Sequence, residues 1–215
     1  MPTLRYRPGD VIEPLALFPL PEVVLFPGAL LPLHVFEPRY RAMTEHVLRG
    51  SRQLSVVLTT GHALGDGPPS LARVAGLGEV IEHTRLPDGR FDLVLLGRAR
   101  VELEELPFVA PYRRARARVL DDDRGLASEA EIDALLFSAA HFVAAVRRHG
   151  PGFDVELPAR AEPAALCDAC AHHLIIDGDD RQRLLETLDV GARLRLCAEL
   201  LAVQAAGLAE RGPPS

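Results

Sequence analysis

Cys167 and Cys170 stand three residues apart, and His173 continues the same spacing. Thiolates and imidazoles are ligands of structural zinc, so this series raises the question of a metal site. Such a site needs a fourth ligand and usually places its C-x-x-C pair in a turn, whereas the surrounding pattern is helical. Both cysteines share a helix face with Leu166 and Leu174, where free cysteine packs as a small hydrophobic side chain. We predict packing cysteines, with no metal, no redox role and no cofactor.

The groups needed for catalysis are also missing. Ser138 and His141 lie one helical turn apart, but the sequence shows no third group that would complete a nucleophilic triad. Neither an H-E-x-x-H metalloprotease motif nor a G-x-S-x-G elbow is present. All 24 residues counted as Lys plus Arg are arginine, so no lysine can serve a P-loop, a Schiff base or a Ser-Lys dyad. The sequence predicts a protein that is not an enzyme.

Three arginines alternate along one predicted strand and therefore share a face: Arg114, Arg116 and Arg118. Such a stripe could contact a nucleic-acid backbone. The alternative is pairing across the sheet with a row of carboxylates, namely Glu102, Glu104 and Glu105. The net charge of −6 and an aromatic content of 5% disfavour a polyanion partner and base stacking. We therefore expect ion pairs here, and nucleic acid is an unfavoured partner.

The stretch from Leu15 to Tyr40 is the most apolar part of the chain. Repeated prolines exclude a membrane helix, because each one removes a helical hydrogen bond. The apolar pieces between them predict buried strands over residues 15–18, 23–26 and 31–36. A helix is expected over Pro38–Arg49 and should end at Gly50. Glu37 is expected to accept N–H groups at the helix start, and Arg39 to tie the helix to a carboxylate of the sheet.

Further short strands follow this helix. Residues 1–14 should form a loosely packed lead-in and residues 61–70 a mobile loop, while Leu86–Gly89 carries the turn residues of a hairpin. Gly76 and Gly78 permit a bulge or a tight bend. In the strand from Arg98 we expect Val101 and Leu103 inward, and Arg100, Glu102 and Glu104 outward. Strands are predicted over 53–59, 72–83, 91–96, 98–106 and 112–120. This pattern indicates a small β-barrel.

The period changes to helical after the composition break at residues 121–125. Apolar spacing predicts helices over 132–146, 162–174, 177–188 and 192–209, with Asp177 or Asp179 as a cap and Gly150 as a stop. Residues 212–215 should be disordered. The predicted fold class is α+β. A β-barrel over 1–120 with one early helix is followed by a bundle of about four helices over 121–215.

Four segments together resemble one known family: FPLPEVVLFPGALLPLHVFEPRY (18–40), GLGEVI (76–81), GRFDLVLLGRAR (89–100) and DDRQRLLETLDVGARL (179–194). They are similar to the N-terminal, substrate-binding domain of Lon proteases, in the same order. The resemblance implies a PUA-like pseudo-barrel. It also implies non-catalytic recognition of protein segments in an adaptor or holdase role, in a free-standing form without the ATPase and peptidase domains. An RNA-binding PUA-like module and a small-ligand pocket protein are the alternatives.

A protein-binding surface is the remaining candidate site. Apolar residues stand at predicted turns, where polar ones are usual: Leu20, Pro21, Phe26, Pro27, Leu86 and Pro87. They either form an exposed patch for protein segments or cover the open ends of the barrel. The expected partners are unfolded or partly folded polypeptides, together with a protease or chaperone. No membrane partner is expected. Three cysteines and the lack of a secretory signal indicate the cytoplasm.

Overall fold

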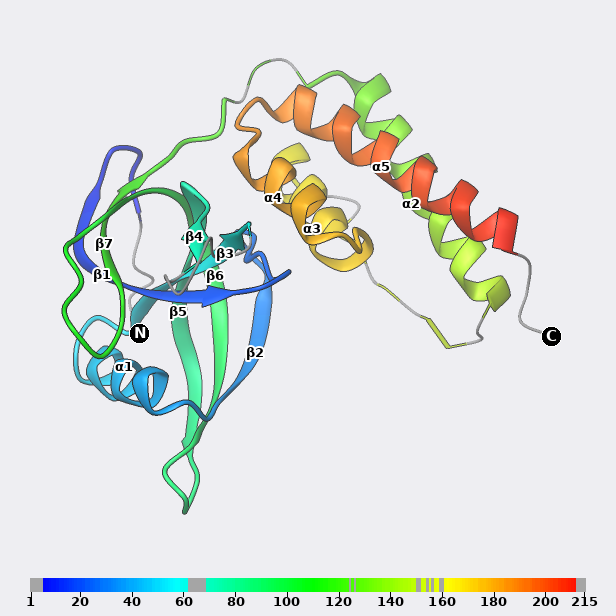
Figure 1. Ribbon diagram of the computed structural model, residues 1–215. Coiled ribbons are helices and arrows are strands. Elements are labelled where there is room, and N and C mark those ends of the chain that lie inside the picture. The colour runs from blue at the N-terminus through cyan, green and yellow to red at the C-terminus, as the bar shows by residue number, and fades with distance from the viewer. Residues whose placement is uncertain are drawn as a thin grey trace. The chain divides into compact units, whose positions relative to one another are not determined.

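The computed structural model describes residues 6–61, 69–123, 125, 127–149, 152, 153, 155, 157, 158 and 161–211. The chain forms two compact units, Met1–Asp121 and Asp122–Ser215. The first unit holds the strands and one helix, and the second holds the remaining helices (Figure 1). No helix among the described residues is long and apolar enough to cross a membrane. The predicted fold class, an α+β chain with an N-terminal barrel and C-terminal helices, is confirmed.

The first unit is a closed β-barrel. Its elements are β1 (Val11–Leu20), β2 (Leu30–Val35), α1 (Pro38–Arg49), β3 (Gln53–Thr60), β4 (Ser70–Leu71), β5 (Val74–Arg85), β6 (Phe91–Glu105) and β7 (Arg114–Val119). The sheet order is β1-β7-β6-β5-β3-β4, and a parallel pairing of β1 with β3 closes the ring. β2 is not part of this ring and pairs with β6 alone among the described strands. The β5–β6 hairpin projects beyond the barrel (Figure 1).

The predicted strand over residues 23–26 is wrong. These residues form no strand, yet Leu25 and Phe26 are fully buried. Their backbone crosses the sheet at two glycines instead of lying beside a strand: a Cβ added at Gly76 would come within 2.0 Å of the Leu25 carbonyl oxygen, and one at Gly97 within 2.0 Å of the Phe26 carbonyl oxygen. This segment gains burial without sheet pairing because the glycines let its backbone approach closely.

Local signals place α1 and the hairpin correctly. Helix α1 spans Pro38–Arg49 and ends at Gly50 as predicted, because proline suits its first turn. The Glu37 side chain makes no capping hydrogen bond, however, and binds the Arg39 Nε at 2.9 Å. Arg39 is therefore paired with its helix neighbour and not with a carboxylate of the sheet. The predicted turn joins β5 to β6, with Gly89 at a φ of 82°.

Three further expectations for the barrel differ in outcome. Gly78 lies opposite Gly97 but Leu77 lies opposite Ala99, so β6 has one extra residue at Arg98, and the predicted bulge near Gly78 is confirmed. Val101 is fully buried as expected, but Arg100, which we expected to point outward with Glu102 and Glu104, is only 3% exposed. Arg100 lies opposite Gly76 of β5, where the segment through Leu25 crosses the sheet. The expectation of a loose lead-in over 1–14 is also wrong from Val11 onward, since that residue begins β1 and pairs with β7. Residues 1–5 and 62–68 lie outside the described part of the chain.

The second unit contains helices at the four predicted places: α2 (Glu129–His149), α3 (Pro163–Leu174), α4 (Gly178–Glu186) and α5 (Val190–Arg211). Asp177 caps α4 as predicted, since its Oδ1 accepts the Asp180 N–H at 2.9 Å. The predicted apolar faces of α2 and α5 are buried, including Leu135, Phe142 and Leu201. The predictions for Gly150 and residues 212–215 lie outside the described residues.

A fully buried arginine lies within the helical core. Arg193 of α5 donates from Nη1 to the Asp122 carboxylate and to the Thr187 carbonyl, both at 2.8 Å. Its Nε lies 3.5 Å from the buried Asp168 carboxylate. Burial acts to lower the pKa of Arg193, but the hydrogen bond to Asp122 and the charges of both aspartates outweigh it and raise that pKa. The guanidinium is therefore a charged group held within an apolar core.

Candidate functional site

The cysteines lie in the core of the helical unit. Cys167, Cys170 and Cys197 are buried and free, and His173 is exposed. Within the described residues no group of three or more His, Cys, Asp or Glu side chains could hold a metal ion. Burial, and then the nearby Cys167, raises the pKa of Cys170 to about 12. A hydrogen bond to Cys167 and burial raise the pKa of Cys197 as well. The predicted packing of Cys167 and Cys170 on an apolar helix face is confirmed.

These thiols are expected to resist alkylation in the folded protein. With a pKa of about 12, Cys170 has little thiolate at pH 8, so it should react about a thousandfold more slowly than in the unfolded chain. The folded state also keeps a proton that the unfolded chain releases above about pH 8.5. This contribution to stability is full below that pH and declines as the pH rises toward the folded pKa. Timed iodoacetamide labelling followed by mass spectrometry checks the rate, and rapid labelling of the folded protein would refute it.

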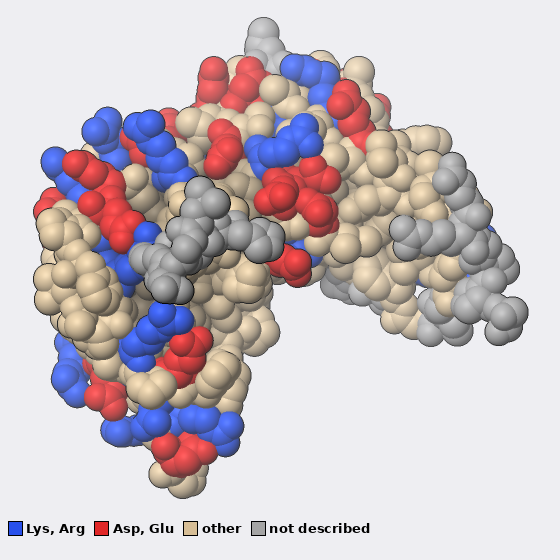
Figure 2. All heavy atoms as spheres, viewed as in Figure 1, with Lys and Arg blue, Asp and Glu red and all other residues tan. Residues whose placement is uncertain are grey.

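The arginine stripe faces carboxylates. Arg114, Arg116 and Arg118 share one face of β7, as predicted, and Glu102 lies opposite Arg118 while Glu104 lies opposite Arg116. Two ion pairs neutralise part of this face: Arg73–Glu102 at 3.0 Å and Arg116–Glu13 at 3.5 Å. Figure 2 shows basic and acidic side chains interspersed over the barrel unit. The arrangement favours pairing across the sheet over a surface for a polyanion.

The six apolar residues predicted as a protein-binding patch do not come together. Phe26 is 0% exposed, so its predicted place on an exposed surface is wrong: the segment that carries it folds into the barrel. Leu86 and Pro87 lie at the turn of the β5–β6 hairpin. Leu20 and Pro21, at the end of β1, line a hollow of 670 Å³ in the surface of the barrel unit. Pro27 is half-buried and does not line that hollow.

This apolar hollow is lined by residues from the end of β1, the start of α1, the end of β3, the residue before β4 and the connection from β6 to β7. Its lining residues are Pro19, Leu20, Pro21, Glu37, Arg39, Tyr40, Thr59, Pro69, Glu105, Phe108, Pro111, Tyr112 and Arg113. Phe108 is 65% exposed, which is high for so large an apolar side chain. It stands between Pro107 and Pro111 in the connection from β6 to β7. The signal that predicted Leu20 as a site residue, an apolar side chain beside prolines, is present at Phe108 too, but Phe108 was not among the predicted residues.

The charged groups around the apolar hollow are paired with each other. Arg113 holds the Glu105 carboxylate through Nε at 2.6 Å and Nη2 at 2.5 Å, and its Nη1 donates to the Pro69 carbonyl at 2.7 Å. The Arg39 guanidinium pairs with Glu37 and lies 4.6 Å from the centre of the Tyr40 ring. Burial raises the pKa of Tyr40 above its ordinary value. The hollow therefore combines an apolar interior with a rim of satisfied ion pairs, which suits binding better than chemistry.

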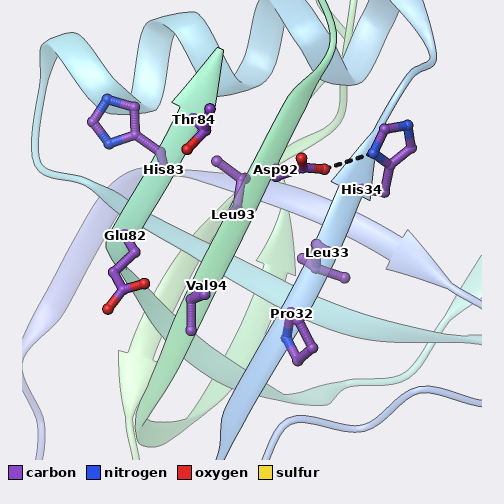
Figure 3. A pocket seen from close by; sticks show the side chains of 9 residues that line it. All are labelled: Pro32, Leu33, His34, Glu82, His83, Thr84, Asp92, Leu93 and Val94. Atoms are coloured by element: carbon purple, nitrogen blue, oxygen red, sulfur yellow. Dashed lines mark hydrogen bonds and ion pairs between the residues drawn. The ribbon is translucent and has the colours of Figure 1, made fainter. Parts of the chain in front are cut away.

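A second, shallower hollow of 440 Å³ lies over the strands of the projecting hairpin and β2. Figure 3 shows Pro32 and His34 on β2, beside Asp92 and Val94 of β6. The His34 ring nitrogen Nδ1 lies 2.7 Å from the Asp92 carboxylate, and both side chains are about half exposed. This hollow is open, and it brings together none of the residues predicted for the site.

Comparison with known proteins identifies the family. Residues 14–203 match the substrate-binding domain of the ATP-dependent protease La (LON). The chain belongs to this family. The resemblance inferred from the four sequence segments is thereby confirmed.

Full-length Lon proteases contain regions similar to this Lon substrate-binding domain. It is 31% identical over 192 residues to the Lon protease of Roseiflexus castenholzii, covering 87% of this chain and 24% of that protein. It is 32% identical over 186 residues to the Lon protease of Phenylobacterium zucineum, covering 83% of this chain and 23% of that protein. The chain thus spans about a quarter of the length of these relatives.

Solved structures agree on the fold. The N-terminal domain of a Mycobacterium avium complex Lon protease superimposes with a TM-score of 0.64 at 17% identity, covering 88% of this chain and 98% of that one. A Lon N-terminal domain protein from Xanthomonas campestris gives a TM-score of 0.60 at 22% identity, covering 85% of this chain and 95% of that one. At these identities the likeness supports the fold alone.

Proposed function

We propose that this Lon substrate-binding domain recognises unfolded or partly folded protein segments, without catalysis of its own, in an adaptor or holdase role in the cytoplasm. One observation carries the proposal: the apolar hollow of 670 Å³ exposes Phe108 while the charges on its rim are paired. An apolar side chain of a client can enter such a hollow without separating a charge from its partner. Lon relatives that are proteases make a peptidase the expected partner.

The energetics of such a site point to weak, salt-insensitive binding. Burial of apolar area contributes about 25 cal/mol per Å², and part of this gain is offset by the ordering of the client. Because Arg39 and Arg113 already hold carboxylates, few counterions are released on binding. The RNA-binding alternative requires the opposite salt response. The small-ligand alternative requires polar groups that converge on the interior, whereas Arg113 directs its donors to Glu105 and Pro69.

Changing Leu20 and Phe108 together to serine should weaken client binding about tenfold, because both apolar walls of the hollow are lost. The client is reduced, carboxymethylated α-lactalbumin, and its affinity is measured by fluorescence anisotropy at about 0.05 M and about 0.5 M salt. The matched control changes Leu86 and Pro87 to serine at the hairpin turn, outside the hollow, and should bind like the parent protein. A folded Leu20→Ser/Phe108→Ser variant with undiminished affinity would place the site elsewhere. A parent protein that binds no client would end the proposal.

A further inference from the structure

Strand β2 has a free edge. Among the described strands it pairs only with β6, so no described strand pairs with its other edge. Its sequence, Leu-Leu-Pro-Leu-His-Val, contains no Asp, Glu, Lys or Arg. Leu30 at its start is 54% exposed, and Phe36, directly after its end, is 60% exposed. Edge strands are usually protected from pairing with another chain by charges or by proline, and β2 has one proline, Pro32, but no charged residue of these four types.

The hydrogen-bond ladder shows which groups of β2 face the free edge. At the hairpin turn the Leu86 N–H binds the Arg90 carbonyl at 2.9 Å, and alternation then directs the backbone of Leu93 toward β2. At the far end of the β2–β6 pairing the Gly97 N–H donates to the Ala29 carbonyl at 2.8 Å, so an odd-numbered residue of β6 again bonds toward β2. The odd-numbered residues of β2 therefore bond to β6, and the even-numbered ones direct their backbone groups away from it.

The outward groups form a nearly complete strand template. Leu30 and His34 offer both an N–H and a carbonyl, and Pro32 offers a carbonyl only. Proline is tolerated at this position because its missing N–H would have pointed away from β6. Figure 3 shows Pro32, Leu33 and His34 in succession along β2. The edge can therefore offer about five backbone hydrogen bonds to an incoming strand.

We propose that an extended segment of a client polypeptide adds to the free edge of β2 as a further strand. The inference rests on the proposed function, which makes protein segments the ligand, and it assigns their backbone to β2. An extended strand is the partner whose N–H and carbonyl groups match this row, and its side chains would cover Leu30 and Phe36. The free edge of β5 is less suitable, because Glu82 and Arg85 place charges there.

Pro32 also argues against a second copy of this chain as the partner. In an antiparallel pairing of two β2 strands centred on Pro32, the two prolines face each other and neither supplies an N–H. The two central carbonyls would then lose their partners. A client strand with an ordinary residue at that position donates to the Pro32 carbonyl, so the edge favours a different chain over self-association.

Amide hydrogen exchange tests this placement directly. In the free protein the amides of Leu30 and His34 point away from β6, so saturation with reduced, carboxymethylated α-lactalbumin should slow their exchange at least about tenfold, as seen by NMR. The inward amides of Leu31 and Leu33 serve as internal controls and should change much less. If the client binds and the Leu30 and His34 amides exchange as before, strand addition is refuted while the proposed function stands. If no client binds, both the proposed function and this inference are refuted.

A charge placed on the edge supplies an independent readout. Leu30→Lys puts a cation beside the incoming strand and should weaken client binding about fivefold. The matched control is Ile81→Lys, which puts the same charge at an exposed apolar position on β5. It should bind within about twofold of the parent protein. If the two variants lose equal affinity for the client, or if Leu30→Lys loses none, the client strand does not bind at β2.

Discussion

Replacing Arg193 with methionine is expected to destabilise the helical unit by about 3–5 kcal/mol. The guanidinium is fully buried, donates to Asp122 and Thr187, and lies 3.5 Å from the Asp168 carboxylate. Methionine fills much of the same volume but leaves two carboxylates in the core without this cation. Removing one partner of a buried ion pair costs more than the pair itself contributes, because the remaining charge stays desolvated.

The measurement exploits the distribution of chromophores. All three tyrosines lie in the barrel unit and tryptophan is absent, so tyrosine fluorescence reports the barrel, while far-UV circular dichroism is dominated by the helices. Urea unfolding should show a lower midpoint in the dichroism signal alone. The control is Arg195→Met, on the same helix, which removes an ion pair between an exposed arginine and Glu131 and should cost below about 1 kcal/mol. If the two variants lose equal free energy of unfolding, the burial of Arg193 does not make its ion pairs more important for stability than an exposed pair.

Gly76→Ala is expected to have a comparably large effect in the barrel, about 3 kcal/mol or more. A Cβ at this position would meet the Leu25 carbonyl oxygen at 2.0 Å and the Leu25 Cβ at 2.8 Å. The obstacle is backbone, so no side-chain rotation can relieve it. The segment that carries Leu25 and Phe26 would have to move away from the sheet and expose both side chains.

Gly50→Ala is the matched control for this substitution. Gly50 follows α1 with a φ of −112°, and an added Cβ would meet nothing closer than 3.6 Å. Its effect on the free energy of unfolding should stay within about 1 kcal/mol. Thermal melts followed by tyrosine fluorescence compare the two variants. A Gly76→Ala protein that melts with the parent would mean that the crossing segment adjusts freely.

The candidate site was only partly accessible from the sequence. Leu20 and Pro21 were singled out because apolar residues at turns are unusual, and the structure places both in the apolar hollow. Phe26 carried the same signal and is buried, whereas Phe108 is exposed and was missed. Turn chemistry shows where the chain reverses, but it does not show which side of the turn faces solvent. That depends on the distant residues that pack against it.

The sequence by itself determined the local elements and the family. Helix α1, the turn at Leu86–Gly89 and the cap at Asp177 follow from backbone preferences and from hydrogen bonds within a few residues, so their signals are complete in short stretches. Tertiary structure alone decided that the segment through Leu25 crosses the sheet at Gly76, that Arg100 is buried and that Arg193 is buried between two aspartates. These features depend on close approach, register and desolvation among residues far apart in the chain, and no single stretch of sequence contains both partners.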